Sequence, residues 1–230
     1  ERQVYFPPPP AATPFDVSFT RPNGVTLGGW VSPGSSEAAL VVFGGNGQAL
    51  EGWRHRRGLS GCTERTLVLV PYRSYEGNPG APREKDLIDD GQAVMAWAQQ
   101  RYRRVGVLGI SLGSGVATAV AAREKNGVDV LLLGTPYDSL SNVANDLMPW
   151  LLPSLLLKDR YPSVERASGV TAPVFVLRAD QDRLIRAPRT EALLKAFGTQ
   201  AKETVVEGGH DTGWQTSAAC DWLRESTQNK

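Results

Sequence analysis

The sequence has few of the residues that build metal, redox or nucleic-acid sites. Its 230 residues include only two cysteines and two histidines, too few for a disulfide framework or a zinc site. The net charge of +1 gives no global argument for binding nucleic acid. We therefore expect no metal, no cofactor and no nucleic-acid partner. We expect Cys62 and Cys220 to be buried free thiols; the alternative, one disulfide, would indicate an oxidising compartment.

Long hydrophobic runs are also missing. No stretch of eighteen apolar residues occurs, so no transmembrane helix is predicted, and no signal peptide is recognisable. The chain begins at Glu1 rather than Met and continues with a Pro-rich segment over residues 1–14. We expect that the sequence has been trimmed at this end. The sequence leaves the location unknown, the alternatives being cytoplasmic, or membrane-anchored or exported if an N-terminal segment was removed.

The composition that remains is that of a globular protein, with 41% hydrophobic and 21% charged residues. Residues 15–20 and 25–31 alternate between apolar and polar, and Asn23-Gly24 between them is a strong hairpin signal. From residue 38 onward, continuous apolar strands alternate with helical patterns. This alternation is typical of an α/β fold, with a mostly parallel sheet covered by helices on both faces. No repeat or linker divides the chain, so we predict one domain over residues 1–230.

The expected elements follow from periodicity and from apolar runs. Parallel strands are predicted at 38–43, 66–71, 105–109, 128–134, 174–179 and 203–207. Helices are predicted from about 48 to 61 and at 84–101, 112–125, 188–197 and 212–225. Residues 137–168 form an insertion, a small cap whose apolar run 147–157 is too short and too rich in proline to span a membrane. We expect this run to pack as short helices on the core, with Leu147 and Trp150 reaching the substrate pocket.

The strongest motif is Gly-x-Ser-x-Gly around Ser111, between the strand at 105–109 and a helix of small residues. Nucleophile elbows have this strand–turn–helix arrangement. Gly109 and Gly113 lack a Cβ, so strand and helix can approach closely while Ser111 occupies a strained turn. The turn would expose the hydroxyl of Ser111 above the sheet and direct the amide of Leu112 at the group it attacks.

A nucleophilic serine needs a base, and the base needs an acid. His210 follows the last predicted strand in a glycine-containing loop, and we prefer it to His55, which we interpret as a surface helix residue. Asp182 lies well out on the loop after the strand at 174–179, and we prefer it as the acid. Three other carboxyl groups compete with it: Asp180, expected to shape that turn; Asp211, expected to fix the histidine loop; and Asp138, the weakest alternative.

The loop at 44–47, Gly-Gly-Asn-Gly, follows the first parallel strand and offers free amides with little steric bulk. We assign the second oxyanion donor to the backbone amide of Asn46, with Gly45 as the neighbouring candidate and a substrate contact. The first donor is the amide of Leu112. Neither a P-loop nor a dinucleotide-binding glycine motif is present, which argues against a nucleotide site.

With Ser111, Asp182 and His210 in this order, the chain resembles the α/β-hydrolase superfamily over residues 16–225. Within it the chain is similar to abhydrolase-domain serine hydrolases of bacteria, which have membrane-associated eukaryotic relatives. The segment 71–84 resembles their Tyr-Arg-Gly-Tyr segment, 173–185 their acid loop and 209–211 their Gly-His-Asn/Asp turn. Three positions depart from the family's pattern: Gly44 stands where the family often has His, Ala179 replaces a Gly, and Arg186 replaces a Pro.

The resemblance implies membrane association through a segment not present here. The residues themselves predict hydrolysis of an ester or thioester by acyl transfer through Ser111, His210 and Asp182, with a small-molecule or acylated substrate. The same three residues also serve peptidases and amidases, which are the nearest alternative. A non-catalytic binding protein of the same fold is the alternative from a different class.

Overall fold

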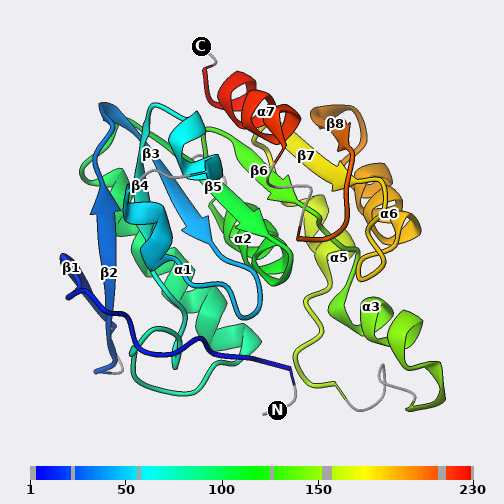
Figure 1. Ribbon diagram of the computed structural model, residues 1–230, viewed down its shortest axis with the longest axis horizontal. Coiled ribbons are helices and arrows are strands. Elements are labelled where there is room, and N and C mark those ends of the chain that lie inside the picture. The colour runs from blue at the N-terminus through cyan, green and yellow to red at the C-terminus, as the bar shows by residue number, and fades with distance from the viewer. Residues whose placement is uncertain are drawn as a thin grey trace.

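One mixed sheet organises the protein. The computed structural model describes residues 4–21, 24–55, 58–124, 127–151, 157–211 and 216–228. The strands in these residues form a sheet in the order β1-β2-β4-β3-β5-β6-β7-β8 (Figure 1). They are β1 (Val17–Thr20), β2 (Thr26–Ser32), β3 (Ser35–Phe43), β4 (Arg65–Leu69), β5 (Arg104–Ile110), β6 (Leu131–Gly134), β7 (Val174–Ala179) and β8 (Ala201–Val206).

Among the described strands of the sheet, β2 runs opposite to the others. β1 pairs antiparallel with β2, and β2 pairs antiparallel with β4. All pairs from β4 through β3 to β8 are parallel. The predicted mostly parallel sheet with an antiparallel start is confirmed. Gly24 belongs to the described turn between β1 and β2, where it has a φ of 82°, whereas Asn23 lies outside the described residues.

Helices cover both faces of the sheet, because its central strands are apolar on both sides. In β3, Val41 and Phe43 pack on one face and Leu40 and Val42 on the other. The first face is covered by α1 (Glu84–Gln99), α2 (Leu112–Arg123), α5 (Ser163–Ala167) and α6 (Ala187–Phe197). The second face is covered by η1 (Glu51–His55), η2 (Gly58–Cys62) and α7 (Ser217–Thr227). None of the described helices is long and apolar enough to cross a membrane.

The stretch after β3 differs from the prediction. A single helix was expected from about 48 to 61, but the described residues form the two short 3₁₀ helices η1 and η2. Glycines at 52, 58 and 61 weaken an α-helix here, and Gly58 takes a φ of 59°. The buried carboxylate of Glu76 accepts hydrogen bonds from the amides of Leu50 and Glu51 at 2.7 and 2.9 Å. Glu76, from a distant loop, therefore binds amides at the start of η1 that have no acceptor within a helix.

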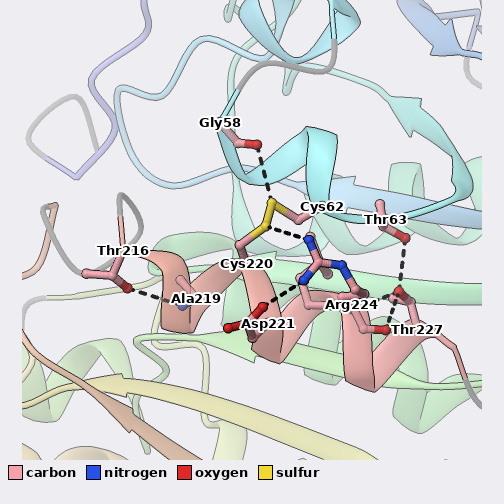
Figure 2. The surroundings of a disulfide bond; sticks show 10 residues. Gly58, Cys62, Thr63, Thr216, Ala219, Cys220, Asp221, Arg224 and Thr227 are labelled. Carbon is pink, nitrogen blue, oxygen red and sulfur yellow. Dashed lines mark hydrogen bonds and ion pairs between the residues drawn. A yellow bond between two sulfur atoms is a disulfide. The ribbon is translucent and has the colours of Figure 1, made fainter.

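The prediction of two free thiols is wrong. Cys62, at the end of η2, forms a disulfide with Cys220 in α7, with the two Cα atoms 5.2 Å apart (Figure 2). The alternative of one disulfide therefore holds; because the two residues are separated by 158 positions in the sequence, no local pattern indicates that they meet. The bridge fastens α7, the helix that follows the His210 loop, to η2.

The insertion between β6 and β7 contains α3 (Leu140–Leu147), η3 (Pro149–Leu151) and α5. Ser139 caps α3 by accepting a hydrogen bond from the amide of Asn142 at 3.1 Å. Helix α3 lies at the lower right of Figure 1, beyond α5 and away from the sheet. Residues 152–156 of the apolar run lie outside the described residues. The role of residues 137–168 as a cap stays a prediction.

Candidate active site

Ser111 lies at the turn between β5 and α2. Its φ is 49°, a left-handed conformation that costs a non-glycine residue of order 1–3 kcal/mol unless the surroundings enforce it. The surroundings here are closely packed. A Cβ on Gly109 would lie 2.4 Å from the carbonyl oxygen of Gly113, and a Cβ on Gly113 would lie 2.1 Å from that of Phe43. The glycines therefore allow the tight strand–helix approach that holds Ser111 in its strained turn.

The structure brings Ser111, His210 and Asp182 into one hydrogen-bonded chain. The hydroxyl Oγ of Ser111 lies 2.9 Å from Nε2 of His210. On the other side of the ring, Nδ1 of His210 lies 2.7 Å from Oδ2 of Asp182. Since a carboxylate only accepts, Nδ1 carries the proton in the neutral ring, and Nε2 is left to accept the hydrogen of the serine hydroxyl. The side chains of His210 and Asp182 are 15% and 3% exposed.

The carboxylate of Asp182 is held on its second oxygen as well. Oδ1 accepts hydrogen bonds from the amides of Leu184 and Ile185 at 2.9 and 2.8 Å. These two bonds curl the loop after β7 around the carboxylate and fix the face that it turns to His210. An Asp whose side chain bonds amides two and three residues ahead is a local turn signal. The turn-forming Asp182 two residues before Leu184 is a signal that could have strengthened the prediction of Asp182 as the acid.

The competing residues have other partners. Asp180 accepts a hydrogen bond from the amide of Gly208 at 2.9 Å, so it ties the acid loop to the histidine loop. Asp138 bonds the amide of Ser139 and forms an ion pair with Arg189. His55 is the last residue of η1, which lies on the face of the sheet opposite to α2. For Asp211, a role in fixing the histidine loop stays a prediction.

The loop after β3 lies directly beside the serine. A Cβ on Gly45 would be 3.5 Å from the Cβ of Ser111. The amide of Gly45 donates to Oε1 of Gln48 at 2.7 Å and is therefore engaged. Within the described residues, the amide of Asn46 makes no hydrogen bond. The amide of Leu112, the first residue of α2, has no intrahelical acceptor. The two amides assigned to the oxyanion thus have no acceptor among the described residues, and their role stays a prediction.

Two buried tyrosines, which the sequence reasoning did not assign to the site, hold the backbone that carries these amides. The hydroxyl of Tyr72 donates to the carbonyl oxygen of Gly44 at 2.7 Å, and that of Tyr137 donates to the carbonyl oxygen of Leu112 at 3.1 Å. Burial is the main cause that raises the pKa of Tyr72 and of Tyr137 above the ordinary value. Both hydroxyls are therefore protonated donors at neutral pH.

Leu147 and Trp150, the other predicted substrate contacts, lie in the insertion at the end of α3 and in η3. They are 40% and 75% exposed. Exposed side chains of this size are available to a ligand, but their contact with a substrate stays a prediction. Across the described parts of the chain, no group of three or more His, Cys, Asp or Glu side chains could hold a metal ion.

Comparisons with known proteins agree with this architecture. The esterase Pf2001 of Pyrococcus furiosus superposes with a TM-score of 0.73 at 17% identity, over 96% of this chain and 97% of that one. Est1E of Butyrivibrio proteoclasticus, solved with ferulic acid bound, gives 0.73 at 12% identity over 91% and 97%. The human alpha/beta hydrolase domain-containing protein 17B is 27% identical over 159 residues, 67% of this chain and 53% of that protein. The chain belongs to the α/β-hydrolase superfamily.

Within this superfamily, a Mycobacterium tuberculosis relative is 35% identical over 232 residues, which is 91% of this chain and 80% of the relative. That protein is uncharacterized. The lysophosphatidylserine lipase ABHD12 of Danio rerio is 26% identical over 137 residues, 52% of this chain and 36% of that protein. No family model matches the chain. The comparisons thus establish an α/β-hydrolase fold similar to that of esterases.

Proposed function

We propose that this protein is a serine hydrolase that cleaves carboxylic ester or thioester bonds through an acyl-enzyme. The observation that carries the proposal is the hydrogen-bonded chain from Ser111 through His210 to Asp182, at 2.9 and 2.7 Å. A serine hydroxyl is a weak nucleophile until a base within hydrogen-bond reach removes its proton. The left-handed turn at Ser111 supports the proposal because it is the strained conformation of a nucleophile elbow.

The reaction would proceed in two halves. As Oγ of Ser111 bonds to the substrate carbonyl carbon, its proton passes to Nε2 of His210. The resulting oxyanion accepts hydrogen bonds from the amides of Leu112 and Asn46. The intermediate collapses to the acyl-enzyme, and the alcohol or thiol leaves with the proton from His210. A water molecule then gives a proton to His210 and attacks the acyl carbon, and the proton returns to Ser111 as the acid is released.

Asp182 stabilises the charge that this cycle creates on the imidazole. Its Oδ2 accepts the Nδ1 proton, which keeps Nε2 available and favours the protonated ring. The two oxyanion amides are each worth about 2.7–4 kcal/mol of barrier, if they act as such donors do in other serine hydrolases. No metal is needed for any of these steps.

The substrate we propose is a small or acylated molecule. Gly45 leaves room beside Ser111, and Leu147 and Trp150 offer apolar surface in the insertion, which we propose as a small cap over residues 137–168. An acyl chain or an aromatic acid fits such surface better than a charged group does. The ferulic acid bound by Est1E is a reason to include an aromatic ester among the test substrates.

The proposal is tested by labelling with a fluorophosphonate, followed by hydrolysis of nitrophenyl esters of increasing acyl length and of a ferulate ester. Wild type should be labelled and should turn over at least one ester, and Ser111→Ala should lose both properties. Ser114→Ala is a matched control, because Ser114 lies one turn along α2 and its buried hydroxyl has no partner among the described residues. Ester turnover that persists at the wild-type rate in Ser111→Ala would refute the proposal. Folded wild-type protein that is never labelled would favour a binding protein, and cleavage of amides in preference to esters would favour a peptidase.

A further inference from the structure

An N-terminal strap, residues 4–14, crosses the same side of the protein as the loop after β3, along the lower edge of Figure 1. Asn46 holds it with its side chain. The oxygen Oδ1 of Asn46 accepts a hydrogen bond from the amide of Phe6 at 2.9 Å, and Nδ2 donates to the carbonyl oxygen of Val4 at 2.6 Å. Tyr75 adds a third bond, from its hydroxyl to Oδ1 at 2.6 Å. All but one of the four hydrogen bonds available to an amide group are thus made, although Asn46 is exposed.

The strap is fastened on one side of Asn46 through Tyr5. The hydroxyl of Tyr5 donates to Oδ2 of Asp159 at 2.8 Å and lies 2.9 Å from the hydroxyl of Tyr161. Tyr161 is buried against α2, where a Cβ on Gly115 would lie 2.9 Å from the Cβ of the tyrosine. This end of the strap is therefore anchored to the helix that begins at the nucleophile.

The strap is also fastened on the other side of Asn46, after four consecutive prolines at 7–10. The amide of Ala11 donates to the carbonyl oxygen of Glu76 at 3.2 Å, and the amide of Thr13 donates to Oε1 of Glu51 at 2.7 Å. A proline run is a stiff extended spacer. The segment between the two anchors is therefore stiff and extended, and it holds Asn46 in place from both sides.

These contacts are made by a residue whose own backbone amide has no acceptor among the described residues. We propose that the strap is a positioning element of the oxyanion hole: the side chain of Asn46, by binding the strap, sets the direction of its own backbone amide toward Ser111. This inference rests on the proposed function. The loop at 44–47 contains three glycines, and without the clamp the described contact that holds the peptide plane carrying the Asn46 amide is the bond from the amide of Gln48 to the carbonyl oxygen of Gly45 at 3.2 Å, so that plane could rotate more readily. The backbone amide of Asn46 would then point at the oxyanion in only a fraction of the enzyme–substrate complexes.

The test separates position from chemistry, because Asn46→Ala removes the clamp and keeps the backbone amide. Tyr5→Phe releases the strap at a remote anchor, and Tyr102→Phe is its matched control, since the hydroxyl of that half-buried tyrosine makes no hydrogen bond within the described residues. Each variant is assayed with a nitrophenyl acetate, which has the smallest acyl group of the series, at a temperature well below its own unfolding midpoint. A Ser111→Ala sample runs in parallel.

We expect Asn46→Ala to lower kcat by about 10- to 100-fold and Tyr5→Phe by about 3- to 10-fold, with KM changed less than about two-fold, because the donor acts on the transition state. Tyr102→Phe should keep wild-type kcat. If both strap variants keep kcat, or if KM alone rises, the strap has no positioning role, and the inference is overturned while the proposed function stands. If wild type shows no turnover beyond that of Ser111→Ala, the proposed function fails, and the inference fails with it.

Discussion

The disulfide between Cys62 and Cys220 should contribute more to the free energy of unfolding than any surface side chain does. It joins η2 to α7, as Figure 2 shows, and closes a loop of 158 residues that contains β4 to β8. The residues just after η2 are also held to α7 by weaker bonds, from Oγ1 of Thr63 to Oγ1 of Thr227 at 3.0 Å and from Nε of Arg65 to the carbonyl oxygen of Thr227 at 3.3 Å. Trp222 and Leu223 keep α7 buried against the sheet. A variant without the bridge should therefore still fold.

The magnitude follows from the loop length. Cross-linking residues this far apart removes loop-closure entropy from the unfolded chain worth about 5 kcal/mol at 25 °C. Strain and residual unfolded-state order reduce such values, so we expect Cys62→Ala/Cys220→Ala to lose about 3–5 kcal/mol of the free energy of unfolding. For a chain of this size the loss corresponds to a decrease in Tm of about 10–15 °C.

Four samples measured by urea unfolding give the answer: oxidised wild type, wild type with a reductant, and the double variant with and without the same reductant. Reduced wild type and the double variant should unfold at similar urea concentrations, both below that of oxidised wild type. The double variant should be insensitive to the reductant. The kcat of the folded protein should change little, because Ser111, His210 and Asp182 keep their partners.

Two results would refute this reasoning. Thiol titration of wild type, unfolded without reductant, that finds two free thiols would show that the bridge does not form. A bridge that is present but changes the free energy of unfolding by less than about 1 kcal/mol would contradict the chain-entropy argument.

Three further predictions concern the site and its supporting loops. Asp182→Asn should lower kcat by about 10³- to 10⁴-fold, because an amide at that position favours the wrong imidazole tautomer; Asp180→Asn, which does not contact the ring, should lose far less in the same ester assay. Gly113→Ala should destabilise by about 1–3 kcal/mol or more and lower kcat, because its Cβ would lie 2.1 Å from a backbone oxygen at the end of β3; Gly52→Ala, with no atom within 4 Å, is its control in urea unfolding. Burial raises the pKa of Glu76 above its ordinary value of 4.5, so the native state binds the proton of Glu76 more tightly than the unfolded chain does. The stability that this proton contributes is therefore lost as the pH rises from the pKa of the unfolded chain through that of the folded protein. The free energy of unfolding of wild type minus that of Glu76→Gln should therefore fall as pH rises from about 4 to 6, and a difference that rises instead would contradict this sign.

The sequence by itself determined the features that depend on neighbouring residues. Continuous apolar runs predicted the parallel strands, and the run at 174–179 coincides with β7. The glycines around Ser111 predicted the strand–turn–helix arrangement, because close backbone approach there admits no side chain. The chain order of Ser111, Asp182 and His210, each after a predicted strand, was enough to predict that they meet, since the carboxyl ends of parallel strands share one edge.

Only the tertiary structure decided the pairings between distant segments. The bridge between Cys62 and Cys220 and the clamp between Asn46 and the strap join residues 158 and about 40 positions apart, and neither leaves a local period or motif. The carboxylate of Glu76 likewise binds the amides of Leu50 and Glu51, at the start of η1, from another loop. In each case a contact between segments that are far apart in the sequence, rather than a local preference, fixes the backbone.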